Sequence, residues 1–84
     1  MSDPVISVII PAYNAQEHIR ECLESVLAQS FRDFEIIVID DGSDDDTGKI
    51  AARMALTDRR VVVDRIWNSG VSVARNRGMS LARG

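Results

Sequence analysis

The strongest constraint on the fold is the alternation of three apolar, β-rich runs with three segments of helical character along 84 residues. The apolar runs are Val5 to Ile10, Phe34 to Asp40 and Val61 to Ile66. Within the second run, Ile36 to Ile39 is continuously apolar, which is typical of a strand covered on both faces. The pattern predicts an α/β fold: one βαβαβα unit whose parallel sheet lies between helices in three αβα layers. No linker or repeat interrupts it, so we interpret residues 1–84 as a single domain.

The first helical segment has the clearest periodicity. Its apolar residues fall at i, i+3, i+4, i+7 and i+8: Ile19, Cys22, Leu23, Val26 and Leu27. The stripe places Cys22 on the buried side, where it would pack as a small hydrophobic residue. Asn14 is the expected N-cap, and Glu17 would return its hydrogen bond in a capping box. His18 lies between the stripe positions, so we expect it to face solvent.

The other two helices are predicted from their first residues and their small side chains. The second would begin at Ser43 or Asp44, where early acidic residues favour a helix N-terminus. The third would begin at about Ser72. Its small residues Ala74 and Gly78 share one face, which lets this helix lie close to the sheet.

Charge and composition exclude several classes of protein. The chain is 45% hydrophobic and 27% charged, as in ordinary soluble domains, and its net charge of -3 argues against a general nucleic-acid-binding surface. Cys22 is the single cysteine, so an internal disulfide is excluded and a cytoplasmic setting is the expectation. The uncharged stretch from Pro4 to Gln16 is shorter than the roughly 18 residues of a membrane span, and no signal peptide is visible.

Polar and aromatic residues follow each predicted strand, where open parallel sheets bind their ligands. These strand tips are Pro11 to Asn14, Asp40 to Ser43, and Asn68 to Gly70. A base could stack on the ring of Tyr13 while a carboxylate accepts an N–H from the base. Arg75, in the next helix, could meet a ring carbonyl or a phosphate. This combination suits a pyrimidine nucleotide.

The same strand tips carry three sequence motifs in a fixed order. They read V-I-I-P-A-Y-N at 8–14, I-V-I-D-D-G-S-D-D-D-T at 37–47 and N-S-G-V-S-V-A-R-N-R-G at 68–78. Together they resemble the family 2 glycosyltransferases, which invert the configuration of the transferred sugar. The resemblance implies the N-terminal half of a GT-A fold, which is Rossmann-like, and a nucleotide-sugar donor that is often a UDP-sugar.

The resemblance also implies roles for individual residues. Pro11, Ala12 and Tyr13 would line the uracil pocket, and Asn14 would be a further nucleotide-binding residue. Asp41 would accept the uracil imide N–H, and Arg75 would contact the base or the diphosphate. Asp40 would brace the loop instead.

No catalytic or metal-binding residue is assigned in these 84 residues. In the family, a D-x-D motif holds a divalent cation, Mn or Mg, on the diphosphate, and it ordinarily follows the next strand, as does the general base. We therefore expect the 84 residues alone to be inactive and to bind no cation, and the full-length enzyme to need one. The acidic residues at 44–46 are interpreted as a solvated helix start rather than a metal site.

Two alternatives to a transferase remain at this point. One is a nucleotide-binding or assembly module without chemistry of its own, and the other is a nucleotidyltransferase, for which the glycine-rich loop with a basic residue is missing. The expected partners are a nucleotide-sugar donor and an unidentified sugar acceptor, with no nucleic acid. In the resembled strand order 3-2-1-4, the strand Val5 to Ile10 has an open edge, which predicts a homo-oligomer. The full-length protein could work at the cytoplasmic face of a membrane.

Overall fold

The computed structural model describes residues 6–29 and 33–83. Its elements follow the predicted βαβαβα order. They are β1 (Ile6–Ala12), α1 (Ile19–Leu27), β2 (Phe34–Asp41), α2 (Thr47–Thr57), β3 (Val61–Ile66) and α3 (Val71–Leu81).

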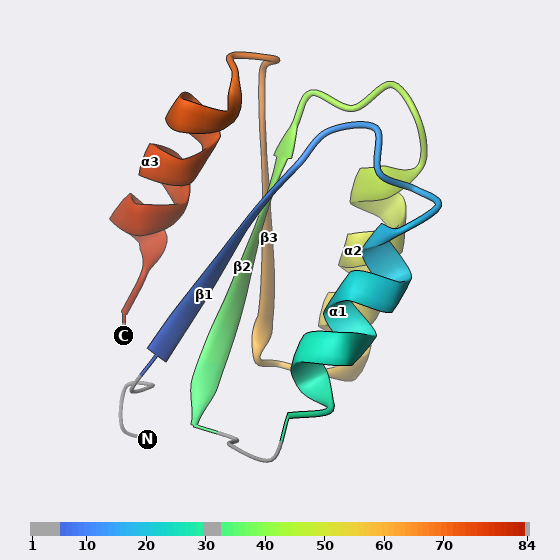
Figure 1. The fold of residues 1–84 in the computed structure, drawn as a ribbon, viewed down its shortest axis with the longest axis vertical. Coiled ribbons are helices and arrows are strands. Elements are labelled where there is room, and N and C mark those ends of the chain that lie inside the picture. The colour runs from blue at the N-terminus through green and yellow to red at the C-terminus, as the bar shows by residue number, and fades with distance from the viewer. Residues whose placement is uncertain (1–5, 30–32, 84) are drawn as a thin grey trace.

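The three strands form a parallel sheet with β2 in the centre. Ile37 of β2 is in register with Ile9 of β1 on one side and with Val62 of β3 on the other. Helices α1 and α2 cover one face of the sheet and α3 covers the opposite face (Figure 1). The predicted α/β fold in three αβα layers is therefore confirmed, and within the described residues β1 is an edge strand.

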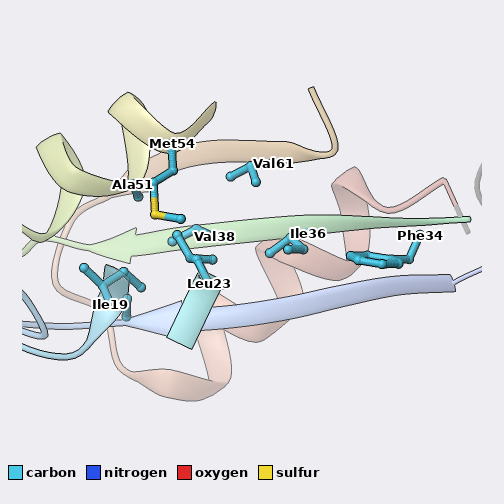
Figure 2. Close-up of a cluster of buried hydrophobic side chains, with 9 residues drawn as sticks. Ile19, Leu23, Phe34, Ile36, Val38, Ala51, Met54 and Val61 are labelled. Atoms are coloured by element: carbon cyan, nitrogen blue, oxygen red, sulfur yellow. The ribbon is translucent and has the colours of Figure 1, made fainter. Parts of the chain in front are cut away.

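Alternation along β2 divides the core between the two faces. Ile36 and Val38 point to the side of α1 and α2, where buried residues from all three strands and both helices meet (Figure 2). This larger cluster comprises Ala12, Ile19, Leu23, Phe34, Ile36, Val38, Ala51, Met54 and Val61. Ile37 and Ile39 point to the other side, where they meet Ala74 of α3. Both faces of β2 are thus covered, as its unbroken apolar run predicts.

Small residues bring α3 against the sheet. Ala74 and Gly78 are buried, and a Cβ atom added to Gly78 would collide with Cγ2 of Ile9. The expected close approach of this helix is confirmed. The helix begins at Val71, one residue before the predicted start.

A buried carboxylate joins the N-terminal end of the sheet to the end of α3. Glu35 in β2 accepts hydrogen bonds from the Ser7 hydroxyl and from the backbone N–H of Arg83, both at 2.6 Å. The Arg83 guanidinium lies 3.3 Å from the same carboxylate. Burial alone would raise the pKa of Glu35, but the hydrogen bonds from Ser7 and Arg83 outweigh it and hold the pKa below its ordinary value.

The strand boundaries differ slightly from the predicted ones. β1 continues two residues beyond Ile10 because Pro11 and Ala12 stay in register with β2. A proline without an N–H is tolerated there since β1 is an edge strand. β2 includes Asp41, one residue past its predicted end, and β3 agrees with the prediction. The predicted first residue, Val5, lies outside the described residues.

The predicted capping box at α1 is wrong. The helix begins at Ile19 with His18 as its N-cap residue, and no side chain caps it. Asn14 instead adopts a positive φ of 49° in a loop whose contacts are tertiary. His18 is exposed, as expected.

The predicted burial of Cys22 is also wrong, since its side chain is exposed. At about 100° per residue, Leu23 and Val26 stay close to the direction of Ile19, whereas Cys22 falls on the flank of the stripe. The sheet therefore covers the centre of the stripe and leaves this flank in solvent.

Helix α2 begins at Thr47, later than the predicted Ser43 or Asp44. Residues 43–46 are held in a loop by hydrogen bonds to the segment after β1, described below. Tertiary contacts therefore replace the expected first helical turn.

Candidate functional site

The loops after β1 and β2 are fastened to each other at the carboxyl end of the sheet. The backbone N–H of Asn14 donates to the Ser43 hydroxyl at 2.9 Å, and Asn14 Oδ1 accepts the N–H of Asp44 at 2.9 Å. Next to this pair, the N–H of Ala15 donates to the Thr47 hydroxyl at 2.8 Å. We call these three hydrogen bonds the tip tether. They hold the backbone that carries Tyr13 against the end of β2.

A second pair of contacts extends the tip tether toward solvent. Gln16 donates its N–H to Asp45 at 3.2 Å, and its side-chain oxygen accepts the N–H of Asp46 at 3.0 Å. The hydrogen bond from the Thr47 hydroxyl to Asp45 lowers the pKa of that carboxyl below its ordinary value. Asp45 is therefore ionised at neutral pH and acts as a hydrogen-bond acceptor in the loop.

Asp40 braces the loop after β2, as the sequence predicts. The buried carboxylate accepts the N–H of Ser43 at 3.0 Å and lies 3.8 Å from Nε of Arg65. Arg65 also donates from Nη2 to the Ser43 carbonyl at 3.0 Å. Gly48 lies so close that an added Cβ atom would collide with the Asp40 carboxylate. This aspartate is 1% exposed, and its carboxylate is engaged within the protein.

Asp41 shapes the turn that leads into α3. Its side chain is 5% exposed, and it accepts the backbone N–H groups of Ser69 at 2.8 Å and Gly70 at 3.0 Å, one on each oxygen. Gly70 has a φ of 98°, a conformation that glycine adopts most easily. A carboxylate has about four lone-pair positions, so two remain for a further donor.

Four of the six predicted site residues line one pocket at the strand tips. Pro11, Ala12, Tyr13 and Asp41 surround a volume of about 210 Å³. Asn68 and Val71 complete the lining. The ring of Tyr13 is 49% exposed at this rim, which leaves it available for stacking.

The other two predicted residues lie outside this lining. The side chain and the backbone N–H of Asn14 both form hydrogen bonds of the tip tether. Arg75 is exposed on α3 and forms no ion pair with any residue in the described part of the chain. The roles predicted for all six residues in binding a nucleotide stay predictions.

The sequence reasoning missed the residues that position this pocket. Ser43 and Thr47 were read as part of a helix start, yet their hydroxyl groups hold the loop after β1. The alternation of Ser and Thr with aspartates in D-D-G-S-D-D-D-T could have indicated a hydrogen-bonded loop. Val71 was also missed because α3 begins one residue early.

The described residues offer no complete set of metal ligands. Across 6–29 and 33–83, no group of three or more His, Cys, Asp or Glu side chains is close enough to hold an ion. In the same ranges, no helix combines the length and the apolar character that crossing a bilayer requires.

Comparison with known proteins gives a consistent result. The family model described as "Glycosyl transferase family 2" matches residues 7–84. The uncharacterized glycosyltransferase EpsJ of Bacillus subtilis is 44% identical over 81 residues, which are 96% of this chain and 24% of EpsJ.

Two solved structures share the fold. The mannosyltransferase PcManGT from Pyrobaculum calidifontis, in complex with GDP-Man and Mn2+, aligns with a TM-score of 0.82 and 27% identity, covering 100% of this chain and 26% of that one. The S. aureus protein TarS, residues 1–349, aligns with a TM-score of 0.84 and 35% identity, covering 94% and 24% of the two chains. The chain thus spans about a quarter of the length of these proteins.

Proposed function

The chain belongs to glycosyl transferase family 2, and we propose that it binds the nucleotide part of a nucleotide-sugar donor whose glycosyl group is transferred to an acceptor. The observation that carries the proposal is the pocket at the strand tips, which joins an exposed aromatic ring, Tyr13, to a carboxylate, Asp41. Such a pocket at the carboxyl end of a parallel sheet is the usual ligand position in open α/β folds.

The size of the pocket supports a base rather than a whole donor. Its volume of about 210 Å³ is below the range of roughly 300 to 1,000 Å³ that holds a drug-sized ligand. The base would stack on Tyr13, and the sugar and diphosphate would lie outside the pocket. Pro11 and Ala12 would form the wall against the base.

We propose uracil as the base, and therefore a UDP-sugar as the donor. The uracil imide has one N–H, which the free lone pairs of Asp41 could accept. Guanine also offers N–H donors, and PcManGT was solved with GDP-Man, so the test below includes both nucleotides.

Arg75 is the proposed contact to the base or the diphosphate. It is exposed on α3, and its guanidinium has no carboxylate partner among the described residues. Asn14 supports the nucleotide indirectly, since the tip tether fixes the backbone next to Tyr13.

The remaining parts of the proposal concern the whole enzyme. A divalent cation, Mn or Mg, would neutralise the diphosphate. The described residues do not form a three-ligand cluster for it. We further propose that the protein is cytoplasmic and forms a homo-oligomer through the edge of β1. The acceptor would be a sugar that we do not identify further.

Isothermal titration calorimetry with UDP and GDP, each with and without Mn2+, tests the proposal. Removing the ring in Tyr13→Ala should weaken UDP binding by about 1 to 3 kcal/mol, the usual contribution of one stacked base. Arg75→Gln should weaken UDP more than uridine if the arginine contacts phosphate. Arg53→Gln is the matched control, because Arg53 is an exposed helical arginine on α2 and does not line the base pocket.

Each result separates one part of the proposal from another. Tighter binding of GDP than of UDP would mean that the preferred base is guanine rather than uracil, and the proposed nucleotide site would stand. Binding that Tyr13→Ala leaves unchanged would reject this pocket. No heat with either nucleotide at millimolar concentration would reject nucleotide binding by these residues.

A further inference from the structure

A second, larger pocket shares Asn68 with the proposed base pocket. Its volume is about 560 Å³, and its lining comprises Gly42, Asp44, Arg65, Ile66, Trp67 and Asn68. The volume is within the range of small-molecule sites, and none of the six predicted nucleotide residues lines it.

Trp67 gives this pocket an unusual wall. Its indole is 88% exposed, so a large apolar side chain is in contact with solvent instead of packing in the core. The residue sits on a fixed loop: its carbonyl accepts the Ser69 hydroxyl at 2.7 Å, and Asp41 holds the N–H of Ser69. The backbone that carries the indole is therefore held in place, while the ring stays accessible to a ligand.

The polar groups around the indole are mixed in sign and in hydrogen-bonding character. Asp44 supplies a carboxylate that accepts, and the Asn68 amide both donates and accepts. Arg65 is 68% exposed and keeps N–H groups beyond those directed at Asp40 and Ser43. One acid and one base leave the lining without net charge.

This balance favours one class of ligand over others. A phosphate would gain no net attraction, because the charge of Asp44 offsets that of Arg65, and a metal ion would find one carboxylate only. A neutral pyranose fits both properties of the lining, because its C–H face packs on an aromatic ring and its hydroxyl groups both donate and accept hydrogen bonds.

We propose that the pocket at Trp67 binds a neutral hexose unit of a glycan, with the indole as its stacking platform. Because Asn68 lines both pockets, the glycan would lie beside the donor nucleotide. Its role as a growing or accepting chain rests on the proposed function, whereas the binding itself does not.

Intrinsic fluorescence offers a selective measurement, because Trp67 is the single tryptophan of the chain. Titration with a panel of neutral tetrasaccharides of glucose, mannose and N-acetylglucosamine should shift its emission to shorter wavelength with at least one of them. Calorimetry should then show that Trp67→Ala weakens binding of that sugar about tenfold or more, as expected for a central aromatic anchor. Trp67→Phe, which keeps a ring, should retain part of the affinity.

Two controls separate this site from the nucleotide pocket and from a general surface effect. Leu56→Ala removes a side chain that is 87% exposed on α2 and should leave sugar binding unchanged. Tyr13→Ala should weaken UDP and leave the tetrasaccharide unaffected, while Trp67→Ala should do the reverse. Sugar binding in a chain that binds no nucleotide would keep this inference and reject the proposed function.

Two outcomes would overturn the inference. The first is an emission spectrum that no tetrasaccharide changes at millimolar concentration. The second is an emission change caused by UDP or GDP and by none of the sugars, which would make the Trp67 pocket a nucleotide surface.

Discussion

Asp41 offers the sharpest test of the reasoning, because its carboxylate is buried and bonded to two backbone N–H groups of the Ser69–Gly70 turn. Asp41→Asn keeps the shape but has one oxygen acceptor, so an amide N–H₂ would face the second backbone donor. Losing one hydrogen bond to a charged group costs about 1.5 to 3 kcal/mol, and loss of the charge weakens the remaining bond by about 1 kcal/mol. We therefore expect a loss of about 2 to 4 kcal/mol in the free energy of unfolding.

The loss should be large on the scale of a small domain. For 60 to 100 residues, each kcal/mol shifts Tm by about 4 to 8 °C, so Asp41→Asn should lower Tm by about 8 to 32 °C. Urea unfolding followed by far-UV circular dichroism measures the free energy, and calorimetry measures Tm.

Asp44→Asn is the matched control. Asp44 is an exposed aspartate of the same loop, and it takes part in the tip tether through its backbone N–H rather than its carboxylate. This variant should stay within about 0.5 kcal/mol of the parent chain. Equal stability of Asp41→Asn and Asp44→Asn would refute the claim that the Asp41 carboxylate holds the turn.

Three further predictions concern the rest of the fold. The pKa of Glu35 is lowered in the folded chain, so its contribution to stability is present above its ordinary pKa and is lost as pH falls through the folded pKa. In urea unfolding from neutral to acid pH, Glu35→Gln should therefore make the free energy of unfolding less dependent on pH. An unchanged pH profile in this variant would count against the role of Glu35. Gly78→Ala should cost about 1 to 3 kcal/mol of unfolding free energy by calorimetry, because the new Cβ atom overlaps Ile9, and a neutral result would mean that α3 shifts without cost. Light scattering across concentrations should detect a homo-oligomer formed through the edge of β1, and a monodisperse monomer throughout would contradict it.

The order and type of every element followed from the sequence, because hydrophobic periodicity depends on neighbouring residues and the folded chain buries the apolar faces that it predicts. The continuous apolar run Ile36 to Ile39 predicted a strand buried on both faces, and Ala74 with Gly78 predicted a closely packed α3. The gathering of Pro11, Ala12, Tyr13 and Asp41 also followed, since parallel strands end at one edge of the sheet.

The errors arose where long-range contacts decide local structure. Asn14 has the side chain of a good N-cap, but its partners are Ser43 and Asp44, about thirty positions away in sequence. No window of neighbouring residues reveals that pairing. The prediction for Cys22 was wrong for a related reason. The apolar stripe of a helix predicts the centre of its buried face, but the width of that face depends on the elements that pack against the helix.

The tip tether has a consequence for motion as well as for shape. It joins the backbone of Asn14 and Ala15 to Ser43, Asp44 and Thr47, so neither loop can leave the sheet without breaking the bonds of the other. In amide hydrogen exchange the two loops should open as a single unit, with one common opening free energy for segments far apart in sequence. Any ligand that stabilises one loop would then slow exchange in the other by the same factor, so the β2 loop would report binding events that occur at Tyr13.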